Sequence, residues 1–181
     1  MENGFDKAIK FIIASETVYK KGHYGDLDYA ISENEPGDDG GLTKFGIDFR
    51  SHPDVDIEKL KYEQAVEIYR KDYWDKSRSE ELPYPLSLVQ VDGAVNTGLG
   101  QQTKFLQRVC GVDDDGIIGP KTLKAALEKC NEDGVKKVCM DIISLRVQFY
   151  KDLAKNRPEK ARFLNGWLNR AEKLKKEVEL A

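Results

Sequence analysis

Glu16 has the clearest chemical potential in this sequence, because it stands where an apolar side chain is expected. Apolar residues recur at steps of three and four from Phe5 to Ile13, which predicts a helix with one apolar face. The next step along that face falls on Glu16. Such a carboxylate either finds hydrogen-bond donors or stays protonated, and a protonated carboxyl is the general acid of glycoside hydrolysis. The structural alternative is a helix end that turns back to water.

The element that must face this helix end is a polar, glycine-punctuated segment that follows it. The paired glycines Gly40 and Gly41 permit positive φ and therefore a tight turn. The pattern of Leu42, Phe45 and Ile47 then predicts a short, partly buried strand or hairpin arm.

Helix, Glu16, loop and the run Asp-Gly-Gly-x-Thr-x-x-Gly-Ile together resemble the start of glycoside hydrolase family 108, the muramidases that include secretion activator proteins. The run is similar, more loosely, to phage lysozymes, in which an acidic residue ending the first helix faces Asp and Thr on a small hairpin. The resemblance implies that Glu16 is catalytic and that Asp39 and Thr43 orient water or substrate. The family motif Glu-Gly-Gly-Tyr is Glu-Thr-Val-Tyr here, so Tyr19 remains a candidate substrate contact while the glycines are absent.

The middle of the chain predicts two helices. Asp56 is placed to cap a short helix that carries Ile57 and Leu60. A second apolar stripe runs from 62 to 74 and ends in Tyr73 and Trp74. Because adjacent residues cannot face the same side of a helix, one of these two aromatics packs inside and the other can line a sugar groove. The pair also resembles a Tyr-Trp segment of the family.

After a proline-containing connector over 77–85, an almost continuously apolar run predicts a buried helix ending near Gly98. Asp92 and Asn96 interrupt this run four residues apart, hence on one face. Their structural role would be to satisfy loop backbone. Their functional role would be to hold sugar hydroxyls or the attacking water, and the stretch resembles the family segment Asp-x-Ala-Val-Asn-x-Gly.

The last third predicts a helix over 102–109, a turn over 112–119, a helix that begins near Pro120 and two further core helices. The turn is similar to the Asp-Gly-x-x-Gly-Pro-x-Thr turn of peptidoglycan-binding modules, and it lacks ligand positions of a standard calcium loop. The lysines Lys173, Lys175 and Lys176 are read as solvating an exposed helix end.

Composition limits the function classes. The chain has 181 residues, 40% hydrophobic and 34% charged, with a net charge of −3 and no basic block, which is typical of a globular protein that does not bind nucleic acid. No apolar run approaches the length of a membrane span. With two histidines, and three cysteines without ligand spacing, we expect free thiols and neither a metal nor a cofactor.

The N-terminus lacks the pattern of a secretory signal, so we expect synthesis in the bacterial cytoplasm and access to the wall by holin-type or secretion-linked export. A prophage lysis protein, or endolysin, and a secretion factor are both compatible with this expectation.

These observations predict a mainly α, lysozyme-like helical fold with a small β-hairpin region. We expect a muramidase-like segment over 1–98 and a peptidoglycan-binding-like helical segment over 99–181, packed as one monomeric unit. The expected activity is hydrolysis of the β-1,4 bond between N-acetylmuramic acid and N-acetylglucosamine in peptidoglycan strands. The alternatives are a non-catalytic peptidoglycan-binding or secretion-accessory protein, and an enzyme acting on chitin-like oligosaccharides.

Overall fold

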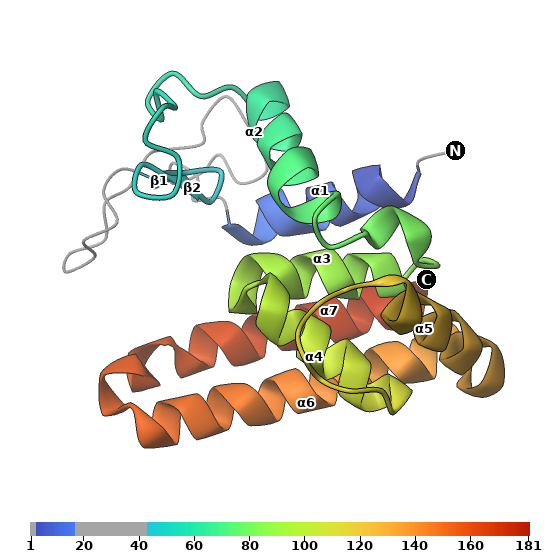
Figure 1. The fold of residues 1–181 in the computed structure, drawn as a ribbon. Coiled ribbons are helices and arrows are strands. Elements are labelled where there is room, and N and C mark those ends of the chain that lie inside the picture. Colours follow the sequence, from blue (N-terminus) through green and yellow to red (C-terminus); the bar gives the residue numbers. More distant parts are fainter. Residues whose placement is uncertain (1–2, 17–42) are drawn as a thin grey trace. The chain divides into compact units, whose positions relative to one another are not determined.

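The computed structural model describes residues 3–16 and 43–181 (Figure 1). Within these residues the protein is mainly α, with seven α-helices and one small two-stranded sheet. This confirms the predicted fold class. None of the described helices combines the length and apolar character that a membrane span requires. The chain divides into two compact units: one contains residues 1–8 and 73–181, the other residues 9–72.

Helix α1 (Gly4–Glu16) is the predicted amphipathic helix, and it belongs to both units along its length. In the unit of residues 9–72, its apolar face buries Ile9, Ile12 and Ile13. Among the described residues, the other core side chains of that unit come from the hairpin, the following loop and α2, namely Phe45, Ile47, Ile57, Leu60, Ala65 and Tyr69. The described part of the helix reaches Glu16, the residue to which the apolar stripe leads.

The sheet is a β-hairpin of β1 (Thr43–Lys44) and β2 (Ile47–Asp48), in which Thr43 pairs with Asp48. The two loop residues Phe45 and Gly46 have φ of 55° and 76°, so both lie in the left-handed region that a type I′ hairpin requires. The predicted arm is therefore confirmed, and its tight turn is at Phe45–Gly46. The glycines Gly40 and Gly41 lie outside the described residues.

The prediction of a helix begun by Asp56 is wrong: residues 57–59 form a single turn. Asp56 still accepts a hydrogen bond from the Lys59 backbone N–H at 3.3 Å, but only residues 57–61 separate it from helix α2, too few to propagate a separate helix. Helix α2 (Tyr62–Tyr69) follows, and the predicted stripe continues as a π-helical turn, η2 (Arg70–Trp74).

The unit that contains residues 73–181 is a helical bundle. Helix α3 (Leu86–Thr97) lies at its centre, with every residue from Leu86 to Ala94 buried, and it packs on α4 (Leu99–Cys110) and α6 (Val135–Asn156). Helix α5 (Pro120–Asp133) has Pro120 in its first turn and covers α4 and α6. A short 3-10 segment, η3 (Ser79–Glu81), lies in the connector, which ends in a cis Tyr84–Pro85 bond.

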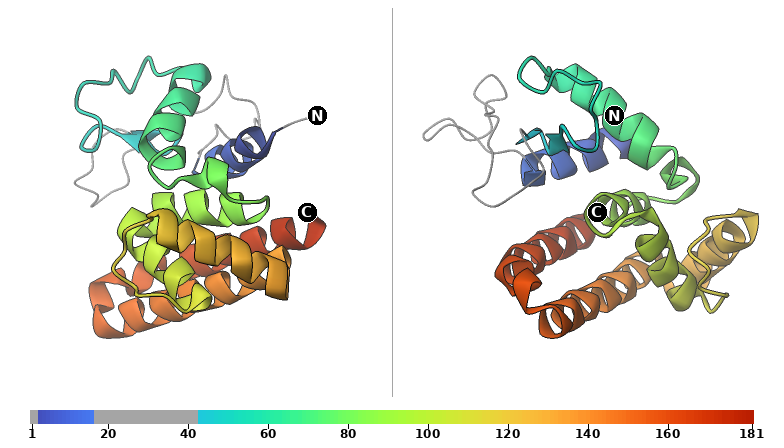
Figure 2. Two further views of the ribbon diagram at one scale, coloured as in Figure 1. Left: turned by 45° about the vertical axis from the view of Figure 1, so that its right-hand side comes forward. Right: turned by 60° about the vertical axis from the view of Figure 1, so that its left-hand side comes forward.

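Helices α6 and α7 (Leu164–Leu180) form a long helical hairpin, joined through the 3-10 turn η4 (Pro158–Phe163). Figure 2 shows the two helices side by side along their length. The shared core of this unit is apolar, with Leu88, Val91, Phe105, Leu106, Val138, Ile142, Ile143, Leu174 and Val178 all buried.

Candidate active site

The predicted acid lies against the hairpin turn. Gly46 packs so closely on helix α1 that a Cβ atom at this position would lie 2.6 Å from Glu16 Cβ and 2.9 Å from Glu16 Cγ. Real Cβ contacts are longer, so only glycine permits this approach. The Glu16 side chain is half-buried. Its aliphatic stem therefore lies against the turn.

The turn itself is held in an unfavourable conformation. Left-handed backbone costs roughly 1–3 kcal/mol for a non-glycine residue, and Phe45 is such a residue. The buried Phe45 ring packs edge-on against Tyr62, with centroids 6.3 Å apart, and the Tyr69 hydroxyl donates to the Phe45 carbonyl oxygen at 2.9 Å. The surrounding contacts thus compensate for the strain and fix the turn beside Glu16.

The loop after the hairpin is held by contacts within itself and with η2. Asp48 accepts hydrogen bonds from the backbone N–H and the hydroxyl of Ser51, both at 2.9 Å. His52 Nε2 lies 3.3 Å from Asp72 Oδ2. These contacts order the segment that follows β2. The hairpin is therefore held by this segment as well as by the packing of its turn on Glu16.

A pocket of about 440 Å³ opens in this loop segment. It is lined by Phe49, Pro53, Asp54, Val55, Asp56, Ile57 and Glu58. The Phe49 side chain is 53% exposed, which is unusual for a large apolar residue. An aromatic face next to carboxylates suits a saccharide, because the ring contacts the apolar face of the sugar and the carboxylates accept hydrogen bonds from its hydroxyls.

Of the other predicted site residues, Thr43 lies in β1 and is half-buried, whereas Tyr19 and Asp39 lie outside the described residues. Tyr73 is half-buried, and its role as a sugar contact stays a prediction.

Trp74 is the aromatic residue that packs inside. Its side chain is 2% exposed, its ring meets Phe5 edge-on at 5.3 Å, and its Nε1–H donates to Glu80 Oε2 at 2.9 Å. Neither ring face is open to a sugar, so we assign Trp74 to the core rather than to substrate binding.

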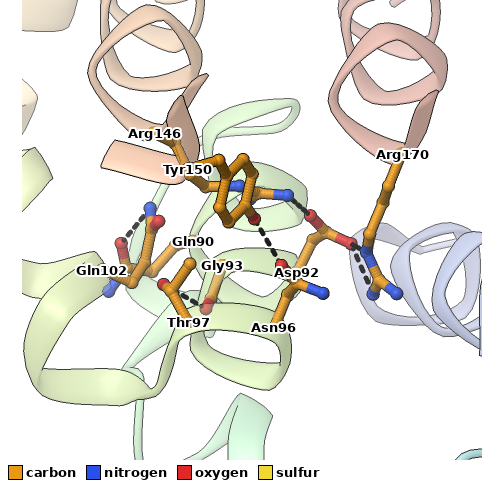
Figure 3. Close-up of polar contacts among 9 residues, drawn as sticks. All are labelled: Gln90, Asp92, Gly93, Asn96, Thr97, Gln102, Arg146, Tyr150 and Arg170. Atoms are coloured by element: carbon orange, nitrogen blue, oxygen red, sulfur yellow. Dashed lines mark hydrogen bonds and ion pairs between the residues drawn. The ribbon is translucent and has the colours of Figure 1, made fainter. Parts of the chain in front are cut away.

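Asp92 also needs correction. Its side chain is 0% exposed, and it accepts hydrogen bonds from Arg146 Nη2 at 2.5 Å and from Arg170 Nε at 2.8 Å (Figure 3). Burial by itself would raise the pKa of Asp92, but the charges and hydrogen bonds of Arg170 and Arg146 outweigh it and hold the pKa below its usual value. The carboxylate joins α3 to α6 and α7, so we assign it to structure rather than to substrate.

Asn96 is half-buried, and its side-chain oxygen accepts a hydrogen bond from the Tyr150 hydroxyl. The structural role predicted for Asp92 and Asn96 was to bind loop backbone, whereas both bind side chains of α6. Arg146 was missed in the sequence, although it carries the same signal as Glu16: a charged residue four positions from Ile142 and four from Tyr150 on an apolar stripe.

The acidic turn before α5 is organised by one buried amide. Gln107 Nε2 donates to Asp115 Oδ1 at 2.7 Å, and Gln107 Oε1 accepts from the Gly116 backbone N–H at 2.9 Å. Arg108 pairs with Asp114. The turn is therefore rigid for structural reasons. Within residues 3–16 and 43–181, no group of three or more histidine, cysteine or acidic side chains could hold a metal ion.

The fold and the Glu16–hairpin arrangement define a lysozyme-like helical protein. Residues 16–98 match the model of Glycosyl hydrolase 108, and residues 101–172 match the Predicted Peptidoglycan domain. Both matches fall at the positions that the sequence motifs predict, and they confirm the predicted resemblance to glycoside hydrolase family 108. These matches support a peptidoglycan hydrolase.

Among solved structures, the chain is similar to the one described as Structure of Brucella abortus SagA. The TM-score is 0.77 and the sequence identity is 26%, over 97% of this chain and 94% of that one. A search of curated proteins gave no match.

Proposed function

We propose that this protein hydrolyses the β-1,4 bond between N-acetylmuramic acid and N-acetylglucosamine in peptidoglycan, with Glu16 as the general acid. The observation that supports the proposal most directly is the position of Glu16: it ends helix α1, is half-buried, and packs its stem against the strained turn of the hairpin. Lysozyme-type catalysis needs a carboxyl group fixed at the edge of a sugar site, so that it can protonate the leaving oxygen.

The remaining groups of the proposed site come from the hairpin and the loop after it. Thr43 in β1 would orient substrate or the attacking water, together with Asp39 and Tyr19 from the preceding segment. The Phe49 pocket would accept a sugar of the same strand, with the exposed ring against its apolar face. In this arrangement the hairpin contributes both the rigid wall beside the acid and the start of the binding surface.

The context of the activity belongs to the same proposal. We place the protein on the cell wall after export, acting as a monomer on glycan strands. Either a lysis role or a secretion-linked role would use the same chemistry, because both require the wall to be opened.

The direct test is Glu16→Gln, which preserves size and removes the proton donor. We expect release of reducing ends from purified peptidoglycan to fall by about 10²–10⁴-fold, the usual contribution of a general acid. Glu67→Gln, an exposed carboxyl in α2, is the matched control and should retain the wild-type rate. Mass spectrometry of the soluble products identifies the bond that is cleaved.

Wild-type turnover by Glu16→Gln would overturn the assignment of the acid. Binding to sacculi by the wild-type protein without any new reducing ends would instead identify a non-catalytic wall-binding protein. Faster turnover on N-acetylglucosamine oligomers than on wall fragments would redirect the substrate to chitin-like glycans.

A further inference from the structure

A basic corner lies where helix α6 ends and the 3-10 turn η4 leads to α7. It consists of Lys151, Lys155, Arg157, Lys160 and Arg162, all exposed. The same span of the chain contains two acidic residues, Asp152 and Glu159, so five positive charges stand against two negative ones. This local excess of positive charge lies in a chain whose net charge is −3.

The cations of the basic corner lack carboxylate partners. Within the described parts of the chain, none of the five forms an ion pair, and Asp152 instead accepts a hydrogen bond from Gln148 at 2.9 Å. Elsewhere in the same unit, Lys124, Lys129 and Lys137 each pair with a carboxylate one turn along their helix, whereas the exposed Lys173 and Lys176 of α7 form no ion pair within the described residues. What distinguishes the corner is therefore that five such cations lie together in one short span of the chain.

A helix dipole explains only part of this arrangement. Cations are favourable in the last turn of a helix, which accounts for Lys155 at the end of α6. Lys160 and Arg162 lie in η4, beyond that helix end, where the dipole no longer acts.

Aromatic side chains connect the basic corner, at Arg162, to the helical bundle. The Arg162 guanidinium lies 4.6 Å from the centroid of the Phe163 ring, which is 5.9 Å from the ring of Trp167. Trp167 in turn stacks on Tyr150 at 5.2 Å, and the Tyr150 hydroxyl donates to Asn96 on α3 (Figure 3). A row of aromatic rings thus connects η4 to the centre of the bundle, and a pre-ordered surface loses less entropy on binding.

We propose that the basic corner binds the carboxylates of the peptide stems carried by peptidoglycan strands. Charge complementarity supports this occupant, because the stems bear several carboxylates along each strand and the corner presents several unpaired cations together. The inference rests on the proposed peptidoglycan substrate. It adds a second contact surface in the unit of residues 73–181, whereas Glu16 belongs to the unit of residues 9–72.

The test measures binding without hydrolysis, so each variant carries Glu16→Gln. The corner variant is Lys151→Gln, Lys155→Gln and Arg157→Gln, three exposed positions. The matched control is Lys124→Gln, Lys173→Gln and Lys176→Gln, which removes three exposed charges from α5 and α7. Sedimentation with purified sacculi gives the affinity, and thermal unfolding verifies that each variant is folded.

We expect the corner variant to bind sacculi about tenfold more weakly at low salt, and the control to change by less than about twofold. The difference should disappear near 1 M salt, where the Debye length is about 3 Å. The parent protein here is the Glu16→Gln variant without further changes. Glycan strands from which an amidase has removed the peptides should bind the parent and the corner variant with equal affinity.

Equal binding by the two triple variants would overturn the proposal. So would tighter binding of peptide-free glycan by the parent than by the corner variant, or retention on phosphatidylglycerol vesicles or duplex DNA rather than on sacculi. None of these results bears on catalysis by Glu16, which is tested separately by the release of reducing ends.

Discussion

The substitution Gly46→Ala tests whether the hairpin turn positions the catalytic carboxyl. At this residue φ is 76°, and left-handed backbone costs an L-residue about 1–2 kcal/mol. The added methyl group would also lie 2.6 Å from both Glu16 Cβ and Tyr69 Oη, where ordinary contacts are 3.4–4 Å. The turn and the helix end must therefore separate by about 1 Å, and a displacement of that size costs roughly 100-fold in rate.

Gly111→Ala is the matched control. Gly111 ends helix α4 with φ of 69°, and nothing lies within 4 Å of the position that its Cβ would occupy. It therefore incurs the same backbone cost without a collision. Thermal unfolding should show a loss of about 1–2 kcal/mol for Gly111→Ala and a larger one for Gly46→Ala.

The decisive assay is the release of reducing ends from peptidoglycan under conditions in which both variants are folded. We expect Gly46→Ala to lose about 100-fold in kcat while Gly111→Ala remains near the wild type. Adding Tyr69→Phe to Gly46→Ala removes one of the two colliding groups and should restore part of the rate. Equal turnover by the two glycine variants would refute the reasoning, because it would mean that moving the turn away from Glu16 does not lower kcat.

Three further predictions concern other parts of the molecule. Asp92→Asn should destabilise the bundle by about 3 kcal/mol, since it leaves Arg146 and Arg170 buried around a neutral group. Folding lowers the pKa of Asp92, so the ionised carboxylate stabilises the folded protein above the unfolded pKa near 4, and this stabilisation is lost as the pH falls below that value. In urea unfolding, the difference in free energy of unfolding between the wild type and Asp92→Asn should therefore narrow as the pH falls below about 4. Burial, and to a smaller extent the neighbouring Cys130, raises the pKa of Cys110 to about 11, so that about 0.1% of this thiol is ionised at pH 8. Because the thiolate is the reactive form, iodoacetamide should label Cys110 about 200-fold more slowly in the native than in the unfolded protein. Phe49→Ala should raise KM on peptidoglycan about fivefold with kcat unchanged, because the exposed ring would bind sugar without touching the reacting atoms; an unchanged KM would remove the pocket from the substrate site.

The sequence determined the elements that lie close together along the chain. The apolar repeat from Phe5 to Ile13 predicted helix α1 and put Glu16 at the next step of its stripe, because a helical stripe requires only local spacing. The pattern of Leu42, Phe45 and Ile47 predicted the hairpin arm, and Pro120 predicted the first turn of α5. Asp56 was the local failure, since a cap signal without enough following residues gives a turn.

The tertiary structure decided what each polar residue binds. Asp92 lies 54 residues from Arg146 and 78 from Arg170, and no local spacing connects residues so far apart. The choice between Tyr73 and Trp74 likewise depended on Phe5 near the N-terminus, whose ring meets Trp74 edge-on. For Gly46, the sequence permits a turn, but the reason that glycine is required is the side chain of Glu16 thirty residues earlier. Sequence patterns encode which face of an element is buried, whereas the partner on that face is fixed only when the chain folds back on itself.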